Sequence, residues 1–254
     1  MVDLEFITEE QGDNAKADEI DIRPRISNIN APHFVFYVKQ QLEDLYGQKR
    51  VEEGGLKVIT TLDWDKQEIA EEVVIEGVEA RSEAYQFSNA SLVAIDPKNG
   101  QIVSMVGSKD YFDDEIDGQV NVATRLRQPG SSFKPIVYTA GFEKGYTPNT
   151  VLWDVTTDFP TFDGIYTPVN YDGDERGPVT VRKALQGSLN IPAVKMSYLV
   201  GLDDTLDLAG RLGYTSLKDA SNYGLAIVLG GAEVQLVEHT NTYATFANDG
   251  VHHD

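Results

Sequence analysis

The sequence predicts an α+β fold in which helices flank a small antiparallel sheet. The main β signal is a pair of apolar, β-branched runs at residues 92–95 and 102–106, which flank an Asn-Gly dipeptide at Asn99. Helical spacing of apolar residues begins at Pro32, before this hairpin, and dominates from Ser131 onward. The expected order is helix, strand, helix, hairpin and then mostly helices, with no internal repeat.

The composition is that of an ordinary globular protein with a strongly acidic surface. The 254 residues include 21 Lys and Arg against 41 Asp and Glu, which gives a net charge of −20. This charge repels phosphate backbones and anionic lipid, and therefore argues against a nucleic-acid partner or a membrane-surface partner. The absence of cysteine excludes disulfides, thiol catalysis and Cys-ligated zinc. Apolar stretches such as residues 34–38 are far shorter than the roughly 20 residues of a transmembrane helix.

The first part of the chain is predicted to hold a tail, a helix, a strand and a second helix. Residues 1–30 are rich in acids and are interpreted as an acidic tail or linker. The helix from Pro32 is expected to stop at Gly47, alternation over residues 56–62 predicts a strand, and Asp63 is a candidate N-cap for the next helix. The inner face of that helix is expected to carry Ile69, Val73 and Ala80, with Ala70, Val74 and Val78 beside them.

The second half is predicted to be mostly helical, with one long irregular segment. Residues 146–178 are rich in Thr, Pro, Asp and Gly, and loops of that length are often functional. The expected helices run from Ser131 to about Lys144, from Thr180 to near Gly187, from Ile191, from an Asp203 cap to Gly213, and over residues 234–247.

An acidic loop after the hairpin invites a calcium hypothesis. Asp113, Glu115, Asp117 and Gly118 match positions 1, 3, 5 and 6 of an EF-hand loop, but the twelfth position is Thr124 instead of the bidentate Glu that the site needs. We therefore expect solvated turns here and no metal site.

Ser131 and Lys134 form a Ser-x-x-Lys motif at a predicted helix start. Residues three apart share one helix face, so the hydroxyl and the amine are expected within hydrogen-bond reach, and helix N-terminal amides can receive an oxyanion. The amine acts as a base only when neutral, which requires its pKa to fall from about 10.4 to about 7. Partial burial and the helix dipole both lower it. By itself, the motif is equally compatible with a capping serine and a solvated lysine.

Ser188 and Asn190 form a Ser-x-Asn triplet at another predicted helix boundary. Side chains at a helix boundary can point into a cleft. The two motifs together, in this order, indicate nucleophilic chemistry more strongly than either motif alone.

The sequence around Ser131 resembles the nucleophile motif of the transpeptidase domain of class A penicillin-binding proteins. It reads Arg-Gln-Pro-Gly-Ser-Ser-Phe-Lys-Pro over residues 127–135. The resemblance covers most of the chain beyond the first 30 residues. It includes the segments at residues 31–35, 46–47, 55–58 and 60–63, the hairpin at 94–97 and 100–102, the Ser-Leu-Asn-Ile-Pro-Ala-Val stretch at 188–194, and the stretches at 229–234 and 243–250.

The resemblance implies a function for each motif residue. Ser131 would attack the carbonyl of a peptidoglycan stem peptide ending in D-Ala-D-Ala, neutral Lys134 would take its proton, and the Ser131 amide would form half of the oxyanion hole. Ser188 would relay a proton to the departing D-Ala, and Asn190 would hold a substrate amide and orient Lys134. A second stem peptide would then form the cross-link, whereas penicillin and other β-lactam antibiotics would acylate the same serine. No cofactor is expected, and the implied location is the extracytoplasmic face of the bacterial membrane.

The family's third motif, Lys-Thr-Gly or Lys-Ser-Gly, does not occur in this sequence. We therefore expect a β-lactamase/transpeptidase-like fold that is incomplete at its C-terminal end, with residues 31–62 as an interdomain segment and residues 63–254 as a partial transpeptidase domain. A glycosyltransferase domain and a membrane anchor would precede it. We expect the fragment alone to be poorly stable and weakly active or inactive, because its hairpin would leave an apolar sheet edge unpaired.

Two other functions remain open from the sequence. A related Ser-Lys acylase, a D,D-carboxypeptidase or a β-lactamase, would transfer the acyl group to water. The base of class A β-lactamases, a Glu on a loop near the cleft, has no obvious counterpart here, although the long segment at 146–178 holds Glu175. A non-catalytic cell-wall scaffold module would keep the cleft without the reaction.

Overall fold

A computed structural model describes residues 1–17, 29–161 and 164–253. The chain divides into two compact units, Met1–Asn30 and Ala31–Asp254. In the first unit, the acidic segment contains a 3₁₀ turn, η1 (Val2–Leu4), and a short helix, α1 (Glu9–Ala17). A reciprocal capping box starts this helix, because Thr8 N–H donates to Gln11 Oε1 at 2.9 Å and Gln11 N–H donates to Thr8 Oγ1 at 3.2 Å. The rest of the predicted tail, residues 18–28, lies outside the described residues.

The second unit begins with helix α2 (Pro32–Tyr46), which ends at Gly47 as predicted and is followed by α3 (Gln48–Glu53). The prediction of a strand over residues 56–62 is wrong. This segment instead runs beside the hairpin, where Thr61 Oγ1 donates to the Ile102 carbonyl and Asp63 N–H donates to the Val103 carbonyl. Leu56 and Val58 remain exposed, so the alternation in sequence does not reflect a buried face.

Helix α4 (Trp64–Tyr85) starts at Asp63, whose carboxylate accepts the Lys66 N–H as predicted for an N-cap. The predicted inner face is only partly correct. Ile69 and Val73 are 60% and 50% exposed. The buried residues of α4 are Gln67, Ala70, Val74 and Val78.

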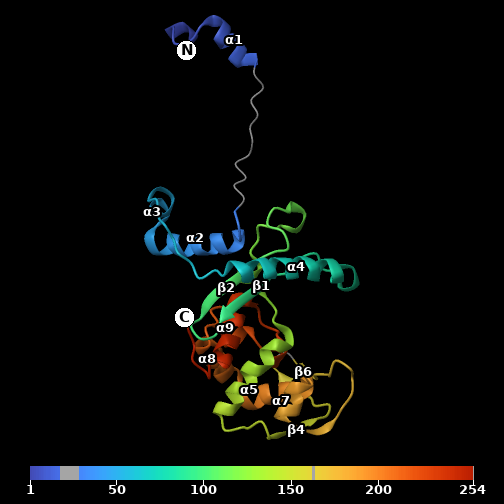
Figure 1. The fold of residues 1–254 in the computed structure, drawn as a ribbon. Helices are drawn as coiled ribbons and strands as arrows, with labels where there is room; N and C mark the ends of the chain where they lie inside the picture. Colours follow the sequence, from blue (N-terminus) through green and yellow to red (C-terminus); the bar gives the residue numbers. More distant parts are fainter. Residues whose placement is uncertain (18–28, 162–163, 254) are drawn as a thin grey trace. The chain divides into compact units, whose positions relative to one another are not determined.

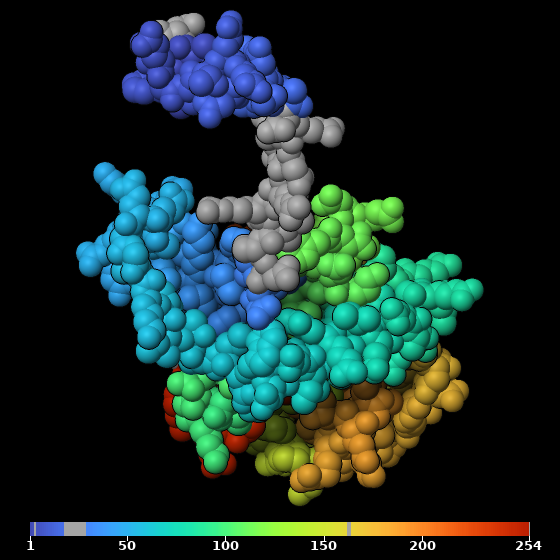
Figure 2. Space-filling model, turned by 45° about the horizontal axis from the view of Figure 1, so that its top comes forward, coloured from blue at the N-terminus to red at the C-terminus, as the bar shows by residue number. Residues whose placement is uncertain are grey.

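The predicted hairpin is confirmed as β1 (Leu92–Asp96) and β2 (Gln101–Val106), joined by the Asp-Pro-Lys-Asn-Gly turn. Leu92 and Val106 face α4, whereas Val93 and Met105 pack with residues of α2 and α9 (Leu236–Ala247). Figure 1 shows α4 and α9 on opposite sides of the hairpin. In the space-filling view, α4 and the segment before it form a continuous teal band over this part of the unit (Figure 2).

The side-chain amide of Gln67 makes the hydrogen bonds that a neighbouring strand would make at the outer edge of β2. Its Oε1 accepts the Met105 N–H at 2.9 Å and its Nε2 donates to the Met105 carbonyl at 3.1 Å, while Ser104 Oγ donates to the same Oε1. The side chain is 1% exposed. A helix side chain therefore satisfies buried backbone groups that would otherwise lack a partner.

The remaining part of the unit is built around a helical core. Helix α5 (Lys134–Glu143) follows the 3₁₀ turn η4 (Gly130–Phe133) and packs against α7 (Asn190–Val200) and α8 (Leu202–Arg211) (Figure 1). Further short elements of the unit are η2 (Asp114–Ile116), η3 (Val122–Thr124), α6 (Val181–Gln186), η5 (Ala220–Asn222), η6 (Leu225–Leu229), and a short ladder of β3 (Leu126–Arg127) with β8 (Val234–Gln235).

The segment at 146–178, predicted to be irregular, contains strands. β4 (Val151–Asp154) pairs with β7 (Gly177–Thr180), and β5 (Phe159–Thr161) pairs with β6 (Gly164–Tyr166). Each ladder is only three or four residues long, which is too short for sequence alternation to identify. Leu152 and Phe159 turn into the same core as α5 and α7, so this segment is anchored next to the Ser188 turn.

In the described residues, no helix combines the length and apolar character needed to cross a membrane.

We predict that Gln67→Leu lowers the free energy of unfolding by about 2 kcal/mol, because the Met105 N–H and carbonyl would stay buried without partners. Urea unfolding followed by circular dichroism measures this change. Ile69→Ala, on the exposed face of the same helix, is the control and should change stability by about 0.5 kcal/mol or less. Equal effects of the two substitutions would contradict the role given to Gln67.

Candidate active site

Lys134 is fully buried and ends in a cage of oxygen atoms. Its Nζ donates to the Ser188 carbonyl at 2.5 Å, to Asn190 Oδ1 at 2.8 Å and to Ser188 Oγ at 3.1 Å. The structure thus brings together three of the four residues predicted for the site, although Lys134 lies more than fifty positions before Ser188 and Asn190 in the chain. A solvated lysine, the alternative that the motif alone allowed, is excluded by this burial.

The cage has no negative charge, since all three acceptors are neutral oxygens. Desolvation therefore dominates, and it lowers the pKa of Lys134 from 10.5 to about 8. The amine can then lose its proton near neutral pH and act as a base.

Ser131 is exposed and lies one 3₁₀ turn before Lys134, whose backbone N–H donates to the Ser131 carbonyl. A 3₁₀ turn aligns residues three apart more closely than an α-helix does. The hydrogen bond that we expected between Ser131 Oγ and Lys134 Nζ is not formed within the described part of the chain. The physical reason is that an ammonium group has three hydrogens and no lone pair, and all three hydrogens are engaged elsewhere.

Ser188 sits in a strained turn between two helices. Its φ is 52°, which is in the left-handed region that a side chain rarely adopts. Thr180 caps α6, and the helix ends at Gly187, after which the Leu189 N–H returns to the Ala184 carbonyl. This sharp reversal directs both the carbonyl and the hydroxyl of Ser188 toward Lys134.

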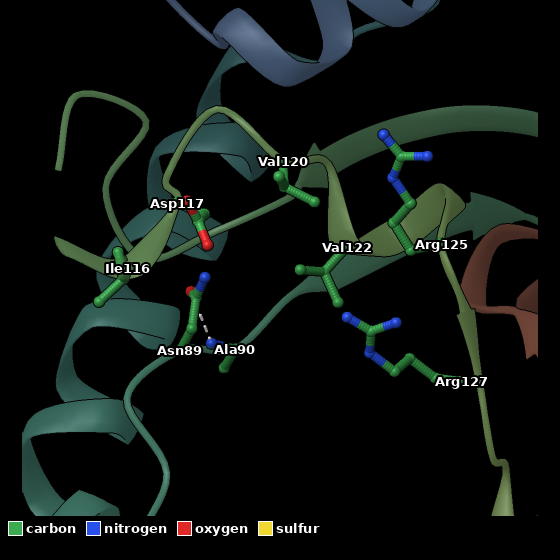
Figure 3. A pocket seen from close by; sticks show the side chains of 8 residues that line it. All are labelled: Asn89, Ala90, Ile116, Asp117, Val120, Val122, Arg125 and Arg127. Carbon is green, nitrogen blue, oxygen red and sulfur yellow. Dashed lines mark hydrogen bonds between the residues drawn. The ribbon is translucent and has the colours of Figure 1, made fainter. Parts of the chain in front are cut away.

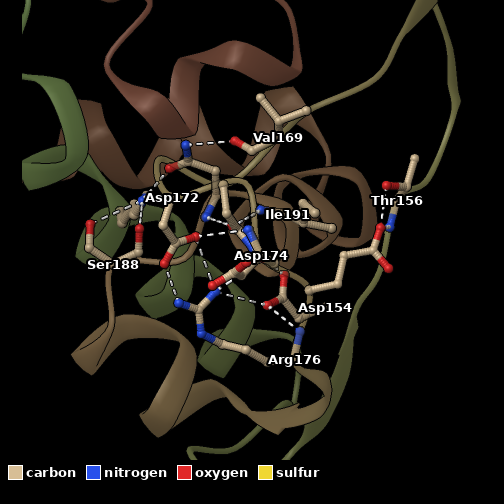
Figure 4. Close-up of polar contacts among 12 residues, drawn as sticks. Asp154, Thr156, Val169, Asp172, Asp174, Arg176, Ser188 and Ile191 are labelled. Carbon is tan, nitrogen blue, oxygen red and sulfur yellow. Dashed lines mark hydrogen bonds and ion pairs between the residues drawn. The ribbon is translucent and has the colours of Figure 1, made fainter.

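Asn190 is held by a second polar network that sequence analysis missed. Figure 4 shows the region of this network around Ser188, Val169 and Asp154. Asn170 Oδ1 accepts the Asn190 N–H at 2.8 Å, and Asn190 Nδ2 donates to the Val169 carbonyl at 2.9 Å. Asn170 Nδ2 in turn donates to buried Asp154 at 2.8 Å. The side-chain amide of Asn190 is therefore oriented with its oxygen toward Lys134. No local pattern marks Asn170 or Asp154, because both lie in the segment without readable periodicity.

Within the described part of the chain, neither the acidic loop nor the histidines form a cluster of metal ligands. Across residues 1–17, 29–161 and 164–253, no group of three or more His, Asp or Glu side chains could hold a metal ion. Asp113 is instead engaged in a turn, where its carboxylate accepts the Glu115 N–H.

A pocket of about 560 Å³ lies beside the segment that leads to Ser131. Figure 3 shows Arg125 and Arg127 projecting from this segment, with Val120 and Val122 lining the same pocket. Among the described residues, no carboxylate lies within 4.0 Å of either guanidinium group. Two guanidinium groups without an ion-pair partner in the described residues and one carboxylate, that of Asp117, therefore line this pocket, which leaves its lining with a net positive charge in a chain whose net charge is −20.

Comparison with known proteins identifies one family. The family described as "Penicillin binding protein transpeptidase domain" matches residues 90–253. Penicillin-binding protein 2D of Bacillus subtilis is 32% identical over 98% of this chain and 36% of its own length. Penicillin-binding protein 1A of Rickettsia bellii is 34% identical over 64% of this chain and 20% of its own length. The chain thus spans about a third or less of these relatives.

Solved structures show the same fold. Penicillin-binding protein 1A from Haemophilus influenzae superposes with a TM-score of 0.75 at 21% identity, over 98% of this chain and 50% of that one. PonA1 from Mycobacterium tuberculosis, solved in complex with penicillin V, superposes with a TM-score of 0.73 at 23% identity, over 89% of this chain and 61% of that one.

We predict that Lys134 titrates with a midpoint of about 8. The chemical shifts of the lysine ε-methylene groups, followed by NMR between pH 6 and pH 11, measure this value, and the loss of one signal in Lys134→Met assigns it. A midpoint at the ordinary value of 10.5 would mean that burial does not neutralise the amine.

Proposed function

This chain belongs to the penicillin-binding protein transpeptidase domain family, and from that premise we propose that it forms the acyl-transfer site of a peptidoglycan D,D-transpeptidase. The observation that carries the proposal is the uncharged cage around the Lys134 amine, formed by Ser188 and Asn190 next to exposed Ser131. Such a cage is of little use in a scaffold module, because it holds a buried amine at a cost in stability.

In the first half-reaction, Ser131 Oγ attacks the carbonyl carbon of the penultimate D-Ala of a stem peptide. Lys134, neutral at that moment, takes the hydroxyl proton as the bond between oxygen and carbon forms. The Ser131 N–H lies in the first turn of η4, where N–H groups have no partner within the helix, and it can donate to the developing oxyanion.

Collapse of the tetrahedral intermediate breaks the C–N bond and releases D-Ala. Its nitrogen needs a proton, and the path from Lys134 runs through Ser188 Oγ, which is 3.1 Å from the amine. In the second half-reaction, the amine of a neighbouring stem peptide attacks the ester, Lys134 accepts its proton, and Ser131 regains its hydrogen. The product is a cross-link, and no cofactor takes part in these steps.

β-Lactams are the expected inhibitors, since they present a strained amide to the same serine. Two structural neighbours are described as complexes of this kind, with penicillin V in one and imipenem in the other. The substrate is part of the cell wall, so the proposed location is the extracytoplasmic face of the membrane.

Glu175 does not serve the water-activated alternative well. Its carboxylate accepts hydrogen bonds from both the N–H and the hydroxyl of Thr156. The hydrogen bonds to this carboxylate lower the pKa of Glu175, which weakens it as a base.

We predict that a fluorescent penicillin labels the chain slowly and stably, and that Ser131→Ala abolishes the label. Gel fluorescence after denaturation measures it, and Ser221→Ala, at another exposed serine, is the control that keeps the label. Rapid loss of label would indicate a β-lactamase. Labelling that survives in Ser131→Ala, or none in the folded wild type, would contradict the proposal.

We further predict that Arg125 and Arg127 attract the carboxylate of the stem peptide. Replacing both with Gln should weaken binding of an acetylated peptide ending in D-Ala-D-Ala about tenfold, but leave its C-terminal amide analogue nearly unaffected. Isothermal titration calorimetry with the two peptides measures the difference. Equal losses for both peptides would assign the two arginines a structural role.

A further inference from the structure

Ser132, the residue after the candidate nucleophile, is bonded to a histidine that lies over a hundred positions away in the chain. Its Oγ is 2.9 Å from His239 Nε2 and 2.5 Å from the Pro129 carbonyl oxygen. On the other side of the ring, His239 Nδ1 is 2.5 Å from the Tyr214 hydroxyl. The Pro129 carbonyl, the Ser132 hydroxyl, the His239 ring and the Tyr214 hydroxyl thus form one continuous series of hydrogen bonds next to the Ser131 turn.

The number of hydrogens on each group determines which group donates in each of these hydrogen bonds. A carbonyl can only accept, so the single hydrogen of Ser132 Oγ points to Pro129. His239 Nε2 must then carry a hydrogen and donate it to Ser132 Oγ. In a neutral imidazole this leaves Nδ1 as an acceptor, which matches the single hydrogen of Tyr214. Each donor is used once, and the ring is held as the neutral Nε2–H tautomer.

The surroundings hold the histidine ring in one place. His239 is 8% exposed, on α9, and its ring packs against those of Tyr214 and Tyr243 with centroid distances of 6.0 and 5.3 Å. Tyr214 also packs on fully buried Phe133, at 5.8 Å. Burial lowers the pKa of His239, which favours the neutral ring that the hydrogen count requires.

Helix α9 makes a second hydrogen bond to the turn that carries Ser131. The Tyr243 hydroxyl donates to the Ser132 carbonyl at 2.8 Å. The Ser132 side chain and carbonyl are therefore both bonded to α9, while its contact with Pro129 closes a four-residue ring around Gly130 and Ser131. The backbone of Gly230 packs directly against Gly130 in this turn. A Cβ at position 230 would lie only 2.1 Å from the Gly130 nitrogen.

We propose that His239 is a positioning residue that, through Ser132, holds the Ser131 turn in the conformation needed for acyl transfer. Its effect on the reaction rests on the proposed function. The Ser131 hydroxyl makes no hydrogen bond with the described residues, so its direction depends on the backbone on either side of it. Small displacements of a reacting atom are costly to the rate, and the hydrogen-bonded chain limits such displacements.

The test compares a variant that removes the donor with one that restores it. His239→Leu keeps a similar volume without an N–H, whereas His239→Gln retains an amide N–H that can reach Ser132. We expect His239→Leu to lower the first-order rate constant of acylation at saturating penicillin by about tenfold, and His239→Gln to stay within about threefold of wild type. The dissociation constant of the non-covalent complex should change little in both, and thermal melting establishes that both fold.

A second measurement does not depend on acylation. In wild type, ¹⁵N NMR of the imidazole should show the Nε2–H tautomer for His239, with its hydrogen protected from exchange. The Ser131 amide resonance should shift in His239→Leu and return toward its wild-type position in His239→Gln.

An Nδ1–H tautomer, or an unchanged Ser131 resonance in His239→Leu, would overturn the positioning role. So would equal acylation rate constants in the two folded variants. If wild type is not acylated at all, the proposed function fails, but the tautomer and the Ser131 resonance still decide the role of His239.

Discussion

The buried amine of Lys134 imposes its requirements on much of the surrounding structure. An amine removed from water needs an acceptor for each hydrogen, and here the acceptors are two oxygens of Ser188 and one of Asn190. Those acceptors must themselves be held in place. Asn170 binds the first backbone N–H of α7, and buried Asp154 binds Asn170, so the geometry around the amine extends back to the β4–β7 ladder. Since none of the direct acceptors is charged, burial also lowers the pKa of the amine.

The turn that carries Ser131 is constrained in a different way. Its hydroxyl stays exposed and free of the network, whereas the residues on both sides are tied down by Pro129, His239, Tyr243 and the close approach of Gly230. The proposed nucleophile has to be accessible to its substrate, and here its position is held through its neighbours. Ser188 is also held in a specific backbone conformation. Its left-handed φ is locally unfavourable, but it directs the carbonyl and hydroxyl oxygens of Ser188 toward the Lys134 amine.

Local signals predicted the elements that local forces control. The hairpin, the cap at Asp63, the stop at Gly47 and the helix after Ser131 all follow from turn chemistry or apolar spacing, and the structure contains them. The predictions failed where contacts with a distant segment of the chain determine the local structure. Ile69 and Val73 were expected inside, but polar Gln67 faces the hairpin instead because it satisfies the backbone of Met105. Residues 56–62 alternate like a strand, yet they make only isolated hydrogen bonds beside β2.

The sequence by itself determined which chemical groups are available: a hydroxyl and an amine three residues apart, a second hydroxyl and an amide in another motif, and a family likeness that links them. It also determined that the first pair lies on one helical turn. Only the tertiary structure decided that Ser188 and Asn190 meet Lys134, that Asn170 and Asp154 support them, and that His239 lies under Ser132. The physical reason is that desolvation and hydrogen-bond satisfaction depend on segments brought together by the core, and these segments are distant in the chain.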